Sequence, residues 1–467
     1  MQMLKNGLTR IGKNTVNRKR LAYFSPLKPD KSAVADYSEK LLQDLKQYFD
    51  IDVYINRTPP SSESILSEFR WYTRRDYELQ RRKTHYDLNV YQIGNSHYHN
   101  FIYPVLARYP GTVILHDANI HHSRAYHHLN QKNPRGYINE ITWCHGASGA
   151  RIGPVIANGF HNPVLYDMYP MLKLVAESAS SIMVHNRFAF NRVARLMDND
   201  RIFPITLPFS DTDLPAYKTA RNHLGIDDNE FVIASFGFIT PEKRIERALN
   251  AFEMFQKEYP ESHYVLVGEP LENDYAEWLY KRIEQIPNAR VTGYVDDTLF
   301  KMWLAACDVS IALRYPTQGE SSDALLRIMG AGKPAIVPAY RQFLEIPDTA
   351  CFHVSLWPNN ADSVLNALQK IKSDRSLAKA IGENARQYVL TYHSQDKWID
   401  SVVSGLHKTM DLPDIEPLSS RCDLFHIRTA PIDECLGLSL SHWNTSATHP
   451  IVLDVLSQTI NELGIHE

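Results

Sequence analysis

The feature that most constrains the fold is a repeated alternation of short apolar, β-prone runs with helical stretches, clearest in the second half of the chain. Residues Phe231 to Ile239 are typical of a strand, 241–259 of a helix, and 263–270 (HYVLVGEP) of a strand that ends in a glycine turn. A further strand at 291–295 (VTGYV) and a helix at 298–307 continue the pattern. Strands and helices that alternate in this way predict a parallel sheet covered by helices on both faces.

The first half of the chain shows the same alternation. A strand at Leu21 to Phe24, a helix at about Ala33 to Tyr48 and a strand at Ile51 to Ile55 form one strand–helix–strand unit. Later strands are expected at Val90 to Ile93 and Thr112 to Leu115, and SSIMVHNRFAFNRV is typical of a strand followed by a helix. Such units place the loops after the strands at one edge of the sheet, where doubly wound folds bind ligands.

The length of 467 residues is too great for one ordinary core and indicates two domains. The polar segment 210–230 is typical of a linker, so we expect a first domain at 21–209 and a second at 210–395, with a crossover helix and an acidic extension in 396–467. Inside that extension, Ile451 to Leu463 has the period of an amphipathic helix. Packing, partner binding and a subunit interface all remain open for it.

Composition excludes several classes of protein. A net charge of −3 gives no argument for nucleic acid, and no apolar run is long enough to span a bilayer. The five cysteines are scattered without CxxC spacing, which favours a reducing cytoplasm over a disulfide framework or a zinc site. Residues 1–20 form a basic arm without the apolar region of a signal peptide. This arm is either a solvated tail or a peripheral contact with anionic lipid at the inner face of the membrane.

The stretch 314–337 (RYPTQGESSDALLRIMGAGKPAIV) is typical of a polar loop, a helix closed by Gly332 and Pro334, and a strand. Glu320, Ser321 and Ser322 therefore lie where the helix begins, and the first backbone amides of a helix attract phosphate. The alternative is that Ser322 is an ordinary helix cap.

Lys243 follows another strand end, after Gly237, and is expected to open a helix at the same edge, where its ammonium group would meet a phosphate.

Two polar clusters follow neighbouring strands of the first half. Gly94, Asn95 and Ser96 come after one strand, and His116 and Asp117 come after the next. Parallel strands bring both clusters to one edge, where they would suit a sugar or a charged intermediate. A metal site among the nearby histidines is disfavoured because their spacing matches no ligand motif. The basic segment within 61–86, expected on a helix, is either a solvated face or a surface for a membrane or an anionic acceptor.

No strand is followed by GxGxxG, and GxxxxGK[ST] is absent. The order of motifs instead resembles the GT-B glycosyltransferases, specifically the GT4 group of retaining enzymes, over roughly Leu21 to Met410. The segments SPLKPDKSAVADYSEKLL, VILHD, FGFITPEKRIERAL and VTGYVDD carry the resemblance together with 314–337. The resemblance implies donor-binding residues Ser32, Ala33, Gly237, Lys243, Gly293, Tyr294, Val295, Glu320, Ser321, Ser322 and Arg327.

The chain also departs from the family pattern. Arg327 stands where the family has its ribose-binding glutamate, and Gly319 stands at the other family glutamate, one position before Glu320. Phe238 replaces the arginine that partners the lysine in many members, and Ala33 replaces a glycine. Arg314 and Arg327 are candidates to supply the missing positive charge.

The resemblance implies two doubly wound, Rossmann-like α/β domains that face each other across a cleft. It also implies transfer of a hexose from a nucleoside-diphosphate sugar to a glycan or lipid-linked acceptor, with retention, in surface polysaccharide biosynthesis and without a metal or other cofactor. His116, Lys243 and Glu320 would act in catalysis, and Asn95, Ser96, Asp117 and His121 would bind the acceptor. The alternative is a GT-B protein impaired in donor binding that serves as a scaffold in glycan assembly. Donor base, linkage and oligomeric state stay open.

Overall fold

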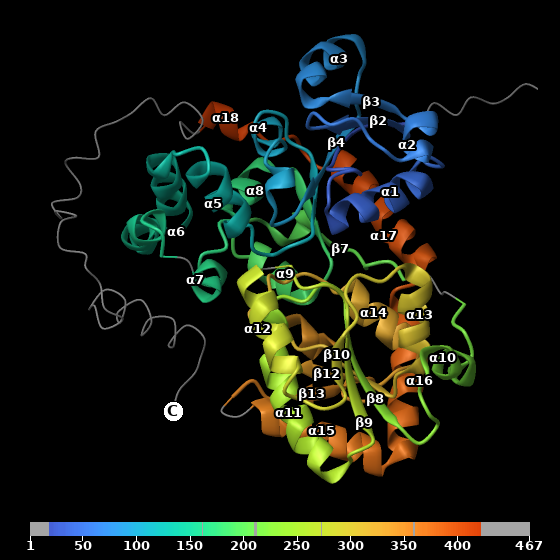
Figure 1. The fold of residues 1–467 in the computed structure, drawn as a ribbon. Helices are drawn as coiled ribbons and strands as arrows, with labels where there is room; N and C mark the ends of the chain where they lie inside the picture. Colours follow the sequence, from blue (N-terminus) through green and yellow to red (C-terminus); the bar gives the residue numbers. More distant parts are fainter. Residues whose placement is uncertain (1–17, 161, 210–212, 272, 358–359, 422–467) are drawn as a thin grey trace, which may run out of the picture.

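The computed structural model describes residues 18–421 except 161, 210–212, 272 and 358–359. The basic arm up to residue 17 and the extension from 422 onward, with the helix expected at Ile451 to Leu463, lie outside the described residues. Two parallel sheets, each with helices on both sides, form the two halves of the molecule (Figure 1). The predicted architecture of two Rossmann-like domains is therefore confirmed.

The N-terminal domain contains a seven-stranded sheet of order β3-β2-β1-β4-β5-β6-β7, in which every pair is parallel. Apolar side chains of its central strands are fully buried, for example Tyr23, Val90 and Val113. Its strands are β1 (Arg20–Phe24), β2 (Asp50–Ile55), β3 (Arg70–Thr73), β4 (Leu88–Ile93), β5 (Thr112–Leu115), β6 (Ser181–Val184) and β7 (Ile202–Pro204). Its helices are α1 (Ala33–Leu45), α2 (Glu63–Glu68), α3 (Tyr77–Lys83), α4 (Tyr103–Leu106), α5 (His121–Leu129), α6 (Pro134–Ala157), α7 (Pro163–Met168), α8 (Lys173–Ser178) and α9 (Arg187–Val193).

The C-terminal domain contains a six-stranded parallel sheet of order β10-β9-β8-β11-β12-β13. Its strands are β8 (Phe231–Phe236), β9 (Ser262–Val267), β10 (Ala289–Val291), β11 (Val309–Ile311), β12 (Ala335–Pro338) and β13 (Phe352–Val354). Its helices are α10 (Tyr217–Leu224), α11 (Ile245–Glu258), α12 (Asn273–Ile283), α13 (Asp297–Ala306), α14 (Asp323–Gly330), α15 (Asn360–Ser373) and α16 (Arg375–Tyr392).

Three local predictions were wrong. Residues 61–86 do not form one helix, because Arg70–Thr73 pairs with β2 as an edge strand and Tyr72 stacks on Tyr54. The strand expected at 291–295 ends at Val291, before the left-handed Gly293. Lys243 does not open the long helix, because Pro241–Lys243 forms a separate 3₁₀ turn (η4). Arg244, with φ of +54°, separates this turn from α11.

After α16 the chain returns to the N-terminal domain through α17 (Gln395–Met410), and α18 (Leu418–Arg421) ends the described part (Figure 1). The fully buried Trp398 of α17 donates its indole N–H to the Tyr37 hydroxyl at 2.9 Å. Near the other end of α17, the hydroxyls of Thr409 and Ser181 lie 2.6 Å apart. The last helices are thus part of the N-terminal core.

The chain enters and leaves the C-terminal domain at adjacent points. The backbone N–H of Phe209 donates to the carbonyl of His393 at 2.7 Å, and Phe209 forms a parallel bridge with Ser394. The His393 ring in turn donates from Nδ1 to the Leu207 carbonyl at 3.0 Å. Both connections between the domains therefore lie side by side.

No helix within the described residues is both long enough and apolar enough to cross a lipid bilayer.

Candidate functional site

The loops after β4 and β5 meet at the carboxyl edge of the first sheet, as predicted. The backbone N–H of Asn95 donates to Asp117 Oδ2 at 2.6 Å. A Cβ at Gly94 would lie 3.1 Å from the same oxygen and 3.4 Å from Val34 of α1, so the start of α1 approaches this edge as well. Ser32 caps α1 by accepting from the Val34 N–H, and Ala33 is its first residue.

His116 is held in one tautomer at this edge. The amide of Gln92 donates from Nε2 to the Tyr23 hydroxyl at 2.8 Å, so its Oε1 accepts from His116 Nε2–H at 2.7 Å. The edge of the ring packs on Tyr37 with centroids 4.6 Å apart. Burial, with the neighbouring His185 adding to it, lowers the pKa of His116 well below its ordinary value. The ring is therefore neutral, and its Nδ1 is an acceptor for a hydroxyl group.

Asp117 faces a carboxylate of the other domain. Burial, together with the negative charge of Glu320, raises the pKa of Asp117 to about 7. Arg314 and the Asn95 N–H act in the opposite direction. Asp117 therefore exchanges a proton near neutral pH.

Lys243 lies at the carboxyl edge of the second sheet. Its ammonium donates to the Phe236 carbonyl at 2.5 Å and lies 3.3 Å from the position of a Cβ at Gly237. Burial, with repulsion from Arg314 as the smaller cause, lowers the pKa of Lys243 to about 7. Positive groups that crowd together in this way are suited to an anion.

Glu320 is bound entirely within its own loop, which we call the 314–322 loop. Its Oε1 accepts from Arg314 Nη1 at 2.6 Å, and its Oε2 accepts from the Thr317 hydroxyl at 2.8 Å and the Gln318 N–H at 2.7 Å. Because three donors from the loop bind the Glu320 carboxylate, this side chain fixes the conformation of the loop.

The loop leads directly into α14. Ser322 is the N-cap: its hydroxyl accepts from the Leu325 N–H at 3.2 Å, as the alternative interpretation of this serine predicted. The first amides of α14, at Asp323 and Ala324, have no acceptor within the helix. The Ser321 hydroxyl accepts from Asn186 of the N-terminal domain at 3.3 Å.

Other predicted donor residues lie around this edge. Gly293 has φ of +72° in the turn after β10, and the side chain of the next residue, Tyr294, is 75% exposed, whereas Val295 is packed against the core. Arg327 pairs with Asp297 at 2.6 Å and covers the ring of Phe300 at 3.9 Å. The Arg327 guanidinium is thus held by α13.

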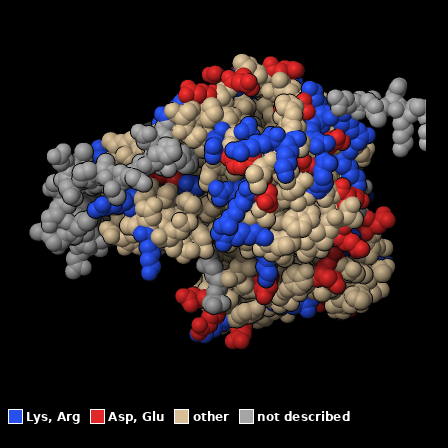
Figure 2. Space-filling model, turned by 90° about the horizontal axis from the view of Figure 1, so that it is seen from above, with Lys and Arg blue, Asp and Glu red and all other residues tan. Residues whose placement is uncertain are grey.

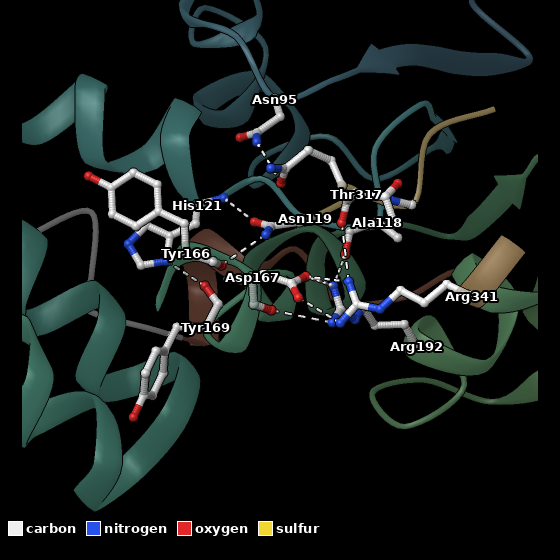
Figure 3. Close-up of polar contacts among 12 residues, drawn as sticks. Asn95, Ala118, Asn119, His121, Tyr166, Asp167, Tyr169, Arg192, Thr317 and Arg341 are labelled. Carbon is white, nitrogen blue, oxygen red and sulfur yellow. Dashed lines mark hydrogen bonds and ion pairs between the residues drawn. The ribbon is translucent and has the colours of Figure 1, made fainter. Parts of the chain in front are cut away.

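His121, one of the predicted acceptor residues, lies inside the N-terminal core. Its ring is fully buried and donates from Nδ1 to the Tyr169 carbonyl at 2.6 Å (Figure 3). Its Nε2 accepts from the Tyr137 hydroxyl at 2.7 Å. Both ring nitrogens of His121 are therefore bonded to other residues of the N-terminal domain, and its role in acceptor binding stays a prediction. Ser96 is close by, where its carbonyl accepts from the Ser123 hydroxyl.

The basic segment lies at one end of the molecule. Arg74 and Arg75 follow β3, and Arg81, Arg82 and Lys83 end α3 with exposed side chains. Figure 2 looks onto this end and shows Lys and Arg side chains gathered on it. Among the described residues, no group of three or more His, Cys, Asp or Glu side chains is placed to hold a metal ion.

The sequence did not reveal the contacts that join the two domains beside the 314–322 loop. Arg341 of the C-terminal domain forms a bidentate pair with Asp167, both bonds being 2.6 Å (Figure 3). Asn95 Nδ2 donates to Gln318 at 3.2 Å, and Asn186 Nδ2 donates to the Gly319 carbonyl at 2.8 Å. These partners lie far apart along the chain and carry no shared motif, so no local pattern could identify them.

Part of the chain is similar to a known family of glycosyltransferases. Residues 217–388 match the family described as glycosyl transferases group 1. An uncharacterised glycosyltransferase of Methanocaldococcus jannaschii is 26% identical over 193 residues, which are 41% of this chain. The match spans about half, 48%, of that relative's length.

Solved structures show the same fold at low sequence identity. Sucrose-phosphate synthase from Thermosynechococcus elongatus is 14% identical, with a TM-score of 0.62 over 85% of this chain and 100% of its own. The Anabaena HepE protein in complex with UDP and glucose is 16% identical, with a TM-score of 0.58 over 84% of this chain and 100% of its own. The architecture is therefore the GT-B fold.

Proposed function

We propose that this chain, in which residues 217–388 form a glycosyl transferases group 1 domain within a GT-B fold, is a retaining glycosyltransferase. Its donor would be a nucleoside-diphosphate hexose and its acceptor a glycan or a lipid-linked glycan of surface polysaccharide biosynthesis. One observation carries the proposal: Lys243, Arg314 and the start of α14 converge at the edge of the second sheet, opposite His116 and Asp117 of the first. The complex of HepE with UDP and glucose, a neighbour of the same fold, supports a nucleotide sugar as donor.

In this proposal the diphosphate lies against Lys243 and the first amides of α14. Negative charge develops on the diphosphate as the sugar leaves, so donors aimed at it stabilise the transition state more than the ground state. Because Lys243 is buried and lies near Arg314, its charged form is disfavoured in the free site. A diphosphate would supply negative charge and restore the full protonation of Lys243.

On the other side, the neutral His116 would accept a hydrogen bond from a hydroxyl of the transferred sugar through Nδ1. The leaving phosphate would receive the acceptor's proton, so no pair of carboxylates is needed. We also expect no dependence on a metal cofactor, since cationic side chains and helix amides face the diphosphate. Addition of a chelator to the purified enzyme should leave the transfer rate unchanged.

Calorimetric titration of UDP, GDP and ADP into the protein tests the proposal. At least one nucleotide should bind, and Lys243→Ala should weaken it by about 1.5–3 kcal/mol, the scale of a hydrogen bond to a charged group. Lys281→Ala, at an exposed lysine of α12, is the matched control and should leave binding unchanged. If the wild-type protein binds none of the three nucleotides, the enzyme proposal fails and the scaffold alternative is favoured.

A further inference from the structure

One short element contacts both the 314–322 loop and the N-terminal domain, beside the direct bonds from Asn95 and Asn186 to the loop. This element is η5 (Arg341–Glu345), a 3₁₀ turn that follows β12. We propose that η5 is an interdomain latch in which Arg341 and Gln342 act as positioning residues for the 314–322 loop. Asp167 of the N-terminal domain would then control nucleotide affinity without touching the nucleotide. The inference rests on the proposed function only in taking this loop as part of the donor site.

Arg341 connects the two domains directly. Its Nη1 and Nη2 donate to the two oxygens of Asp167 at 2.6 Å, and Nη1 also donates to the Thr317 carbonyl at 3.1 Å (Figure 3). The side chains of Arg341 and Asp167 are only 10% and 8% exposed. A bidentate pair removed from water in this way fixes orientation as well as distance. The loop residue Thr317 is therefore placed relative to the N-terminal domain.

A second arginine, Arg192, also pairs with Asp167, so the contact between the domains depends on the negative charge of Asp167. Arg192 of α9 lies 3.5 Å from Asp167 and donates to the Ala118 carbonyl at 3.2 Å (Figure 3). The two guanidinium groups also lie 4.7 Å and 4.9 Å from the centre of the Phe188 ring. Two buried cations thus share one anion, so removing the charge of Asp167 would leave them facing each other.

Two further residues of η5, Gln342 and Glu345, bind the 314–322 loop and the N-terminal domain respectively. Gln342 Nε2 donates to the Thr317 hydroxyl at 2.5 Å and to the Glu320 carbonyl at 3.0 Å, so it holds both sides of the loop. The carboxylate of Glu345 accepts from the Arg187 and Phe188 N–H groups of α9 at 2.9 Å and 3.0 Å. The first and last residues of η5, Arg341 and Glu345, therefore bind the N-terminal domain, and Gln342 between them binds the loop.

The backbone of Arg341 is consistent with this role. Its φ is +49°, in the left-handed region that residues other than glycine rarely adopt. Such a conformation persists where surrounding contacts over-determine it, and it is concentrated at functional sites. Here the contacts that hold it are the bonds to Asp167 and Thr317.

The experiment compares full-length wild-type protein with three variants. Asp167→Asn removes the shared charge, and Glu345→Ala removes the second contact, at an exposed position. Glu140→Gln is the matched control, because Glu140 forms an equally buried bidentate pair with Arg124 that lies wholly inside the N-terminal domain. The two readouts are the radius of gyration of the free protein from solution X-ray scattering and the affinity for UDP, GDP and ADP from calorimetry.

We expect Asp167→Asn to enlarge the radius of gyration and to weaken nucleotide binding about tenfold, a usual size for coupling between two sites. Glu345→Ala should shift both readouts in the same direction by less, and Glu140→Gln should lower only thermal stability. If Asp167→Asn does not fold, the radius of gyration and the nucleotide affinity of Glu345→Ala decide between the latch and its absence.

Wild-type values for both readouts in Asp167→Asn and Glu345→Ala overturn the latch. An enlarged radius with unchanged affinity overturns the positioning role. If wild-type protein binds no nucleotide, the proposed function fails separately, and scattering alone then supports or overturns the latch.

Discussion

Lys243 has an unusual pKa, and the proposed nucleotide binding should therefore depend on pH. In the free protein the pKa is lowered to about 7, and a bound diphosphate raises it. Binding therefore takes up a proton above pH 7, and affinity should fall as pH rises, by up to about tenfold per unit until the pKa of the complex is reached. Calorimetry in two buffers of different ionisation enthalpy measures this uptake directly. Lys243→Arg should abolish it, because arginine stays charged. Equal heats in the two buffers would contradict the prediction.

Asp117 should make the protein less stable at high pH. Its pKa is raised to about 7 in the folded state, above about 3.9 in the unfolded chain, so its stabilising contribution is complete below pH 4 and is lost as pH rises through 7. Asp117→Asn should therefore raise the free energy of unfolding at pH 8 by about 4 kcal/mol, the equivalent of a shift of about three pKa units, and change it little at pH 4. Asp323→Asn, at an exposed position of α14, is the matched control. A gain that is equal at both pH values would refute the assignment.

The positions of several residues of the candidate site could be predicted from the sequence, because each lies directly after a recognisable strand. His116, Asp117 and Asn95 belong to this group, and so does Gly237. Arg341 and Asp167 could not be predicted, since 174 residues separate them and neither belongs to a local pattern. The sequence predicts Glu320 near the start of α14, where it lies. Its bonds to Arg314, Thr317 and Gln318 could not be predicted, because they form only when the loop is folded.

At the scale of elements, the 314–322 loop requires glycine at 319. Gly319 has φ of +81°, and a Cβ there would lie 2.7 Å from Ala118 Cβ and 2.9 Å from the Phe188 ring. Gly319→Ala should therefore push the loop away from the N-terminal domain and weaken nucleotide binding. Gly225→Ala is the matched control, because Gly225 also has positive φ, of +66°, but no atom within 4 Å of its Cβ. The control should lose about 1–2 kcal/mol of stability and keep its affinity. Equal affinity in both variants would show that the close approach does not matter.

Helices and strands were predicted correctly where the apolar residues had a clear period. The prediction failed where pairing with a neighbouring strand determines the structure. The buried strands β1, β4 and β5 and the helix α1 follow from apolar runs and caps in the sequence. The four residues of β3 are polar and aromatic and become a strand because β2 offers a free edge. Likewise β10 is only three residues long, and its length depends on β9.

At the scale of the whole molecule, α17 fastens the end of the described chain to the N-terminal domain. Trp398→Ala would remove a fully buried side chain and the bond to Tyr37, which itself packs on His116. We expect a loss of about 3–5 kcal/mol in unfolding free energy, measured by urea denaturation. Trp278→Ala, at a tryptophan that is 39% exposed, should lose far less. Similar losses in the two variants would show that α17 does not anchor the fold.

The adjacent crossings at Phe209 and His393 make the C-terminal domain an insert in the N-terminal one. The N-terminal core is completed by α17 only after the chain has built and left the other half. A protein in which a short glycine linker replaces residues 210–393 should therefore still form the seven-stranded sheet with α17 in place. For protein engineering, this means that the C-terminal domain could be exchanged as a unit for a related domain at this single pair of junctions.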